Sequence, residues 1–271
     1  MIDPLLPTKK STKKHTKKIK LSKKYYYLLK TAELEDLSTQ LDNILRNIKK
    51  QNPPTTQSEI LKKLTDLNEK IDDLIELYLP STSDTNLNIP TNNIEALMLK
   101  AKLLENLAEF KRSNVVLEQA ISTYHEVLLM GHKVPENNFK NSGDKCIKLM
   151  KFRGWNGKAI RILQMLIQRF SDNHNQDVEY RKQLGVTFLS MNNNRAAKEV
   201  FEVLIEITPH DYYVQAHLGF IVKAEALEAS DDEKLQNAVD LLEFGIKNQV
   251  ENGVDQPLDG LFYFHLGGMY A

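Results

Sequence analysis

The side chains whose chemistry could support catalysis are few and scattered along the chain. Cys146 is the only cysteine, which excludes an internal disulfide and a cysteine-based zinc site. Its place on an apolar helix face predicts a buried packing thiol instead of a reactive one. The seven histidines form no H-E-x-x-H motif, and no glycine-rich phosphate loop is present. The chain therefore offers little from which to build a catalytic or metal centre.

Two of the histidines stand in the same local sequence. His217 and His265 each precede a Leu-Gly pair, so they occupy equivalent positions of a repeated segment. A structural repeat explains this similarity without a shared metal ion. We therefore expect neither histidine to be a metal ligand.

A spaced set of small and apolar residues defines the repeat most clearly between residues 178 and 211. The set comprises Leu184, Gly185, Phe188, Ala197, Phe201 and Pro209, and Leu218-Gly219 restates its opening pair 34 residues later. This spacing resembles the tetratricopeptide (TPR) pattern, in which two helices form a hairpin and the hairpins stack. Gly185 and Ala197 predict a close helix crossing, with Phe201 filling the space beside it. The expected fold is an all-α, TPR-like helical-hairpin solenoid.

Further copies of the template follow this repeat. Leu218-Gly219 pairs with Ala238 and Leu242, and a longer polar loop is expected between the two helices at residues 229–233. Leu266-Gly267 then opens another first helix, which is expected to be a truncated last repeat because the chain ends soon after it.

Copies that match the template less closely precede the repeat at residues 178–211. Ala159 and Ala120 mark second helices, and their first helices are expected near residues 144–151 and 96–111. Together the copies predict a TPR-like repeat domain over residues 94–271.

Residues 25–79 are expected to form a separate helical hairpin. Two apolar stripes with helical spacing run through it: Leu34, Leu37, Leu41, Ile44 and Ile48, then Ile60, Leu64, Leu67, Ile71, Leu74 and Tyr78. Asn52-Pro53-Pro54 separates the two helices. A coiled coil between copies of the chain is the alternative, although each stripe is short for one. Residues 80–93, rich in Ser, Thr and Asn, are expected to be a linker.

The first 24 residues are expected to form a disordered basic tail. Residues 1–30 hold ten lysines against Asp3 alone, a net charge of +9 in a chain that is neutral overall. The stretch Lys9–Lys24 either attaches to anionic lipid headgroups or an acidic protein, or is a solvated spacer. Nucleic-acid binding is disfavoured, because no zinc knuckle, RNA-binding sheet motif or interleaved aromatic residues accompany the lysines.

Composition and hydropathy limit the classes of protein to which this chain can belong. With 271 residues and 41% hydrophobic residues, the chain is long enough for a sizeable core or for a solenoid. No stretch approaches about 18 uninterrupted apolar residues, and no hydrophobic segment follows the N-terminal lysines. We therefore expect neither a membrane span nor a signal peptide in this chain.

Several stretches of the repeat domain resemble aspartyl/asparaginyl β-hydroxylases more closely than they resemble a generic TPR. They are Leu107–Glu109, Arg112–Asn114, Ala120–Val127, Glu206–Asp211, His217–Ala224 and Phe262–Gly267, and they occur in the family's order. The resemblance covers most of residues 96–267, whereas the lysine tail matches only as a basic stretch. After Leu266-Gly267 the chain departs from the family, which has an acidic residue there.

The resemblance implies a setting that the residues alone do not. Members of the family are type II endoplasmic reticulum membrane proteins, and their C-terminal domain is an Fe(II)- and 2-oxoglutarate-dependent dioxygenase that hydroxylates Asp or Asn in EGF-like domains. The repeats are expected to help engage these substrates. The iron-binding and 2-oxoglutarate-binding residues lie in that C-terminal domain, and this chain ends at Ala271. We therefore expect no catalytic residue and no cofactor here, and predict that the chain alone is inactive.

Helix geometry predicts which residues meet a partner. The concave face would carry Glu179, Lys182, Val186 and Leu189 from one first helix, Tyr213, Ala216, Phe220 and Lys223 from the next, and Leu261 and Phe264 from the last. The candidate peptide-binding residues are Lys182, Val186, Tyr213, Phe220, Lys223 and Phe264. Aromatic faces beside lysines suit an extended or loop-rich, partly acidic polypeptide. Packing of Phe220 and Phe264 between repeats is the alternative.

Two functions stay open at this point. The first is the non-catalytic, substrate-engaging repeat region of a β-hydroxylase-like protein of the endoplasmic reticulum. The second is an independent TPR scaffold or adaptor that binds proteins, or an anionic membrane through Lys9–Lys24.

Overall fold

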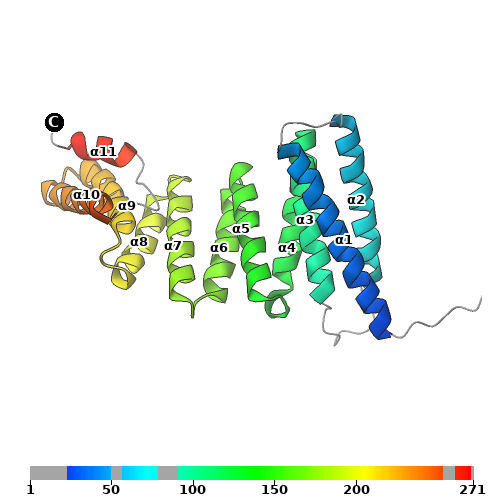
Figure 1. Ribbon diagram of the computed structural model, residues 1–271. Coiled ribbons are helices and arrows are strands. Elements are labelled where there is room, and N and C mark those ends of the chain that lie inside the picture. The colour runs from blue at the N-terminus through cyan, green and yellow to red at the C-terminus, as the bar shows by residue number, and fades with distance from the viewer. Residues whose placement is uncertain (1–22, 50–56, 79–90, 253–259, 270–271) are drawn as a thin grey trace, which may run out of the picture. The chain divides into compact units, whose positions relative to one another are not determined.

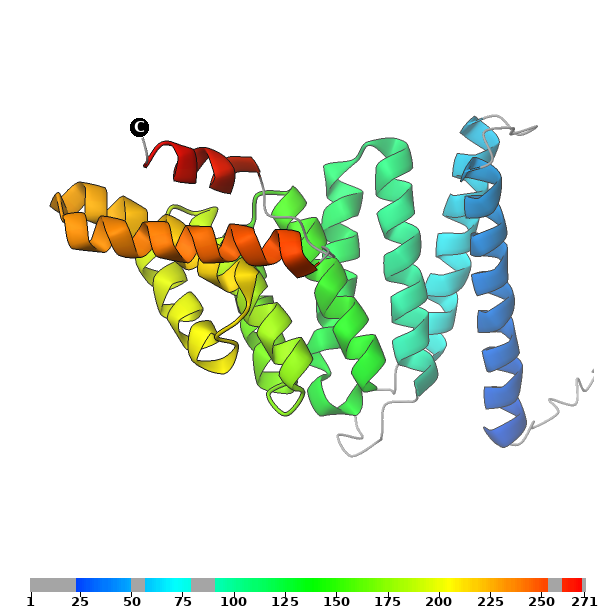
Figure 2. The ribbon, with the colours of Figure 1, turned by 60° about the vertical axis from the view of Figure 1, so that its left-hand side comes forward.

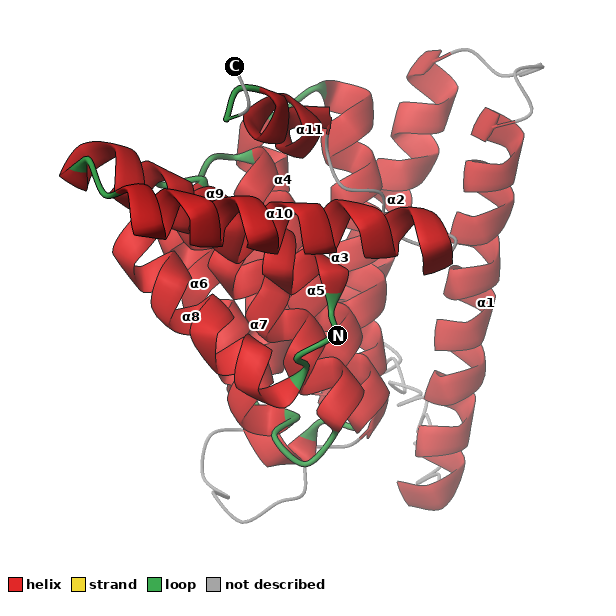
Figure 3. Cartoon of the chain, turned by 90° about the vertical axis from the view of Figure 1, so that its left-hand side faces the viewer, coloured by secondary structure: helices red, strands yellow, loops and turns green. Residues whose placement is uncertain are grey.

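Every element of the computed structural model is a helix within the ranges that it describes, which are residues 23–49, 57–78, 91–252 and 260–269 (Figure 3). The tail expected at 1–24 and the linker expected at 80–93 lie outside these ranges, apart from residues 23–24 and 91–93. The chain divides into two compact units, residues 1–77 and 78–271.

Two helices build the first unit, α1 (Lys23–Lys49) and α2 (Gln57–Tyr78), and they lie side by side in both ribbon views (Figures 1 and 2). Leu37 and Leu41 of α1 are buried, as are Leu64 and Ile71 of α2. All four belong to the two apolar stripes in the sequence. The helical spacing of apolar residues in the sequence therefore identified side chains that are buried in the folded unit.

Antiparallel helix hairpins build the second unit (Figure 1). The helices are α3 (Thr91–Lys111), α4 (Asn114–Leu129), α5 (Glu136–Phe152), α6 (Asn156–Arg169), α7 (His174–Leu189), α8 (Asn194–Ile207), α9 (Tyr212–Ala229), α10 (Asp232–Asn252) and α11 (Gly260–Gly267). Each helix from α3 onward contacts the next, and first helices also contact across repeats, α3 with α5 and α9 with α11. This connectivity confirms the TPR-like helical-hairpin solenoid.

Each of three hairpins closes at a crossing that has no room for a side chain. A Cβ atom on Gly185 of α7 would lie 2.7 Å from the Phe201 ring of α8. Equivalent atoms on Gly143 and Gly219 would lie 2.6 and 2.9 Å from leucine side chains of α6 and α10. The four alanines that marked the second helices, Ala120, Ala159, Ala197 and Ala238, are fully buried. The predicted close crossing is confirmed, because only small residues let the backbones approach this far.

The turns inside the four hairpins share one backbone conformation. Arg112, Gly154, Asn192 and Ser230 have positive φ angles of 48°, 71°, 56° and 53°. The residue after each donates its N–H to a carbonyl in the preceding helix: Ser113 to Ala108, Trp155 to Met150, Asn193 to Phe188 and Asp231 to Ala226. This bond closes a Schellman motif, which satisfies carbonyls at the end of the first helix and reverses the chain.

The prediction of a longer loop at residues 229–233 is wrong. α9 continues to Ala229 and α10 begins at Asp232, so the connection is as short as the others. The extra residues instead lengthen these helices to 18 and 21 residues, against 16 and 14 in α7 and α8. The end of α9 is rich in Ala, Leu and Glu, and the helix propensity of these residues outweighed their polarity.

Cys146 lies on the buried face of α5 and has no solvent exposure. Its thiol lies 3.7 Å from the carbonyl oxygen of Ile121, and burial raises its pKa to about 12. The side chain therefore stays a neutral thiol, which confirms the expected packing role. None of the described helices combines the length and the apolar character needed to cross a bilayer.

The crossing at Gly185 can be tested by truncating the ring that fills it. Because Phe201 is fully buried, we expect Phe201→Ala to lower the free energy of unfolding by about 3–5 kcal/mol. Val203→Ala on the exposed side of α8 is the matched control and should change it by about 0.5 kcal/mol or less. Urea unfolding followed by circular dichroism measures both. Equal losses in the two variants would contradict the assigned crossing.

Candidate functional site

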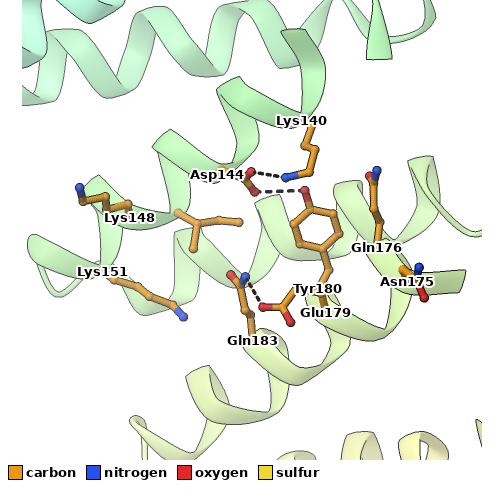
Figure 4. A pocket seen from close by; sticks show the side chains of 10 residues that line it. Lys140, Asp144, Lys148, Lys151, Asn175, Gln176, Glu179, Tyr180 and Gln183 are labelled. Carbon is orange, nitrogen blue, oxygen red and sulfur yellow. Dashed lines mark hydrogen bonds and ion pairs between the residues drawn. The ribbon is translucent and has the colours of Figure 1, made fainter. Parts of the chain in front are cut away.

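A groove runs between α5 and α7, the first helices of two adjacent repeats, and has a volume of about 510 Å³ (Figure 4). It is called the α5–α7 groove below. α5 contributes Lys140, Asp144, Lys148 and Lys151, and α7 contributes Glu179, Tyr180 and Gln183. These α5 residues recur at helical spacing, so they project from one face of the helix.

One end of the α5–α7 groove is held by a network around Asp144. Lys140 Nζ lies 2.7 Å from Asp144 Oδ2, and the Tyr180 hydroxyl donates to Asp144 Oδ1 at 3.0 Å (Figure 4). Burial, followed by the neighbouring Asp144, raises the pKa of Tyr180 far above its usual range. The phenol therefore stays protonated and keeps donating, which joins the two first helices at this end.

The other end of the α5–α7 groove holds two lysines without a partner among the described residues. Lys148 is exposed, whereas Lys151 is partly buried, and burial lowers the pKa of its ammonium. Lys151 extends toward Gln183, whose amide donates to Glu179 Oε1 at 3.1 Å (Figure 4). Two cations thus stand beside a polar wall, and no carboxylate within the described ranges pairs with either of them.

A second groove, of about 560 Å³, lies between α3 and α5 and is called the α3–α5 groove. Its lining includes Leu117, Leu149 and Phe152, and the Phe152 side chain is 79% exposed. Glu105 lines the same groove but is paired with Lys145 at 2.9 Å. Lys148 lines both grooves.

Lys182 and Tyr213, two of the residues predicted from sequence, meet between α7 and α9. Lys182 Nζ lies 2.5 Å from Asp211 Oδ2 and 5.6 Å from the centre of the Tyr213 ring. Val186, from the same face of α7, packs partly buried against the core cluster around Phe201. These side chains connect neighbouring repeats.

Phe220 and Lys223 meet at α11. The Phe220 ring centre lies 6.4 Å from that of Phe262 and 4.8 Å from that of His265, and Lys223 Nζ donates to the His265 carbonyl at 2.8 Å. Phe264 points elsewhere and is 74% exposed. Phe220 and Lys223 thus hold α11 against α9, whereas Phe264 faces solvent.

Ala216 and Leu261 were also expected on the concave face. Ala216 is fully buried in the cluster with Leu242 and Phe262, so that assignment is wrong. The close packing of α9 against α10 and α11 encloses it. The side chain of Leu261 lies outside the described residues.

The α5 residues of the groove were not identified from the sequence. The first helix expected at 144–151 is in fact α5, Glu136–Phe152, and it contains Gly143. Lys140 stands three residues before Gly143, as Lys182 stands three before Gly185. Recognising Gly143 as the crossing glycine would have placed Lys140 on the face where Lys182 was predicted.

His217 is buried in an aromatic cluster on α9. Its ring centre lies 5.2 Å from that of Phe201, 4.1 Å from that of Tyr213 and 4.8 Å from that of Phe262. Nδ1 donates to the Tyr213 carbonyl at 2.8 Å, and burial lowers the pKa of His217 to about 4. The ring is therefore neutral near pH 7 and acts as a packing residue.

No three His, Cys, Asp or Glu side chains converge to hold a metal ion anywhere in the described ranges.

Comparison with known proteins supports the resemblance seen in the sequence. The chain is 36% identical over 168 residues to human aspartyl/asparaginyl beta-hydroxylase and 34% identical over 168 residues to the mouse protein. Each match covers 62% of this chain and 20% of the relative. The resemblance to aspartyl/asparaginyl β-hydroxylases is thereby confirmed, over about a fifth of the length of these relatives. No protein-family model matches the chain.

Solved structures with a similar arrangement are helical repeat proteins. They include MamA (residues 41 to the end) from Desulfovibrio magneticus RS-1, with 12% identity and a TM-score of 0.45 over 80% of this chain and 97% of that one. A tetratricopeptide repeat protein from Parabacteroides merdae has 14% identity and a TM-score of 0.47, over 87% and 73%. YrrB, described as a TPR protein with an unusual peptide-binding site, has 16% identity and a TM-score of 0.42, over 84% and 97%. Similarity at this level carries no information on function.

Acid should destabilise the C-terminal repeats through His217. In the unfolded chain this histidine takes up a proton near pH 6.5, whereas in the folded protein its pKa is about 4. Its contribution to stability is therefore fully present above pH 6.5 and falls by roughly 3 kcal/mol as the pH drops to 4. We expect His217→Phe to remove this part of the decline in urea unfolding measured across that range. The exposed His210, changed to Gln, is the control that keeps it. A wild-type slope in His217→Phe would contradict the assignment.

Proposed function

We propose that this chain is the non-catalytic repeat region of an aspartyl/asparaginyl β-hydroxylase-like protein of the endoplasmic reticulum. In this role it helps to engage EGF-like domains for a dioxygenase domain that uses Fe(II) and 2-oxoglutarate, and it performs no chemistry itself. The observation that carries the proposal is the 36% identity to the human β-hydroxylase over 168 residues.

The surface of the repeats supports a role in holding a polypeptide. The α3–α5 and α5–α7 grooves lie on either side of α5 and share Lys148. They combine cations that have no ion-pair partner among the described residues with the exposed ring of Phe152. Stacked helical repeats commonly offer such extended surfaces to partners. Mixed apolar and charged lining suits a loop-rich chain, since apolar burial supplies affinity and charge directs the encounter.

Binding without turnover is the expected result for the purified chain. An EGF-like domain titrated against it should bind saturably in calorimetry, and a Kunitz-type domain of similar size and net charge should not. Incubation with Fe(II), 2-oxoglutarate and the EGF-like domain should give no hydroxylated product in mass spectrometry. Either hydroxylation by the chain alone or equal binding of both domains would contradict the proposal.

The basic tail supports a second candidate, an adaptor on anionic membranes. The lysine-rich stretch Lys9–Lys24 carries a charge that anionic headgroups attract, by about 1 kcal/mol per lysine near the surface. We expect vesicles containing phosphatidylserine to retain the full chain in sedimentation at low salt and to release it at high salt. A variant that starts at residue 25 should not be retained. Equal retention of both forms would exclude this function.

A further inference from the structure

We propose that the α3–α5 and α5–α7 grooves bind an extended polypeptide segment that carries a single carboxylate near a large apolar side chain. The carboxylate lies between Lys148 and Lys151, and the apolar side chain packs on Phe152. This inference rests on the proposed function and deepens it, because it states which chemistry in a partner the repeat region recognises.

Several other lysines of the repeats are already paired with carboxylates. Lys140, Lys145, Lys182 and Lys198 each pair with a carboxylate at 2.5–2.9 Å. Lys148 and Lys151 have no such partner in the part of the chain that the structure describes. They stand three residues apart on α5, where Cβ atoms of neighbouring helical side chains are about 5–6 Å apart. Their ammonium groups point in different directions (Figure 4), and a rotamer change of the exposed Lys148 brings both within reach of one incoming carboxylate.

Partial burial makes the pairing favourable at Lys151. Its ammonium has lost part of its hydration without gaining a counter-charge, and burial lowers its pKa accordingly. A carboxylate that binds beside it supplies the missing counter-charge. The desolvation of the ammonium has already occurred in the free protein, so binding does not add that cost. Lys148, which is exposed and lines both grooves, directs the acidic group toward this point.

The apolar part of the recognition comes from Phe152. This ring follows Lys151 directly, and 79% of its surface is exposed at the end of α5. Leu117 and Leu149 line the same α3–α5 groove. An apolar side chain placed there would cover the ring, and burial of this kind contributes about 25 cal/mol per Å².

Acidic residues at the edges of the grooves limit the charge of the ligand. Asp144 is held by Lys140 and Tyr180, and Glu105 is held by Lys145. Glu179 accepts from Gln183, and Glu109 lines the α3–α5 groove. Asp144 and Glu105 are balanced by their lysines, whereas Glu179 and Glu109 have no cation partner among the described residues, so a second negative charge in the ligand would meet repulsion from these two. The surface therefore selects one carboxylate over a polyanion.

Gln176 adds an acceptor for the backbone of the segment. It lines the α5–α7 groove, and its Oε1 atom is buried without a hydrogen-bond partner among the described residues. A backbone N–H of an extended segment satisfies this atom after a rotation of the amide.

The test uses the full chain and fluorescein-labelled synthetic peptides in a Gly-Ser background. The first peptide contains one Asp and a Leu three residues later, the second replaces Asp by Asn, the third replaces Leu by Ser, and the fourth is a run of Glu. We expect the first to bind at least about fivefold more tightly than each of the other three in fluorescence anisotropy, and its affinity to fall with salt. Equal affinities, or tightest binding of the Glu run, would overturn the proposal.

Matched variants localise the binding. Lys148→Ala/Lys151→Ala should weaken the first peptide about fivefold or more, and Phe152→Ala about threefold, whereas the exposed Lys133→Ala and Leu129→Ala should not. Thermal unfolding shows that each variant is folded. Unchanged affinity in both groove variants would overturn the proposal.

Carboxylate recognition by the groove and engagement of EGF-like domains can fail independently of each other. If an EGF-like domain binds the wild-type chain and the Lys148→Ala/Lys151→Ala variant equally well, the recognition of a carboxylate by these lysines fails and the proposed function stands. If no EGF-like domain binds while the first peptide still depends on Lys148, Lys151 and Phe152, the proposed function fails and the recognition chemistry stands.

Discussion

The close approach of the two helices in each hairpin is the constraint on which the repeat region depends. Where a first helix crosses a second, Gly143, Gly185 and Gly219 leave no space for a Cβ atom, and Leu166, Phe201 and Leu242 fill the volume instead. Dispersion contacts of such a large side chain are numerous only when the facing backbone is bare. The crossing therefore sets the distance and rotation of each hairpin, and with them the face that each first helix presents.

The grooves follow from that rotation. Because Gly143 and Gly185 face their partner helices, Lys140 and Lys182, three residues earlier in each helix, take equivalent positions on the presented side. The two positions nevertheless differ in use. Lys182 pairs with Asp211 and helps to join two repeats, whereas α5 carries Lys148 and Lys151 further along without partners. Some charged side chains of the repeats thus join neighbouring helices, whereas others have no ion-pair partner among the described residues and are proposed to bind a ligand.

The C-terminal repeats show the opposite balance. α11 lies on α9, and Phe262, His217 and Phe220 join in one aromatic cluster. Residues that the repeat register would present to a partner are thereby committed to packing, as Lys223 is to the His265 carbonyl. Burial of a neutral histidine at this point links the integrity of these repeats to pH. In these C-terminal repeats, the side chains of α9 and α11 hold the helices together.

The helical class, the hairpin repeat and its crossing residues could be predicted from the sequence, because Gly185, Ala197 and Phe201 mark a local packing requirement that recurs at regular intervals. The sequence also indicated the resemblance to the β-hydroxylases. It did not determine the register of α5, whose crossing glycine lies in a looser copy, or the length of α9 and α10, where helix propensity and polarity pointed in different directions. Which surface charges are paired emerged from the packing of the repeats, because the partners of Lys145 and Lys182 lie on α3 and at the N-cap of α9, at distances along the chain that no local pattern encodes.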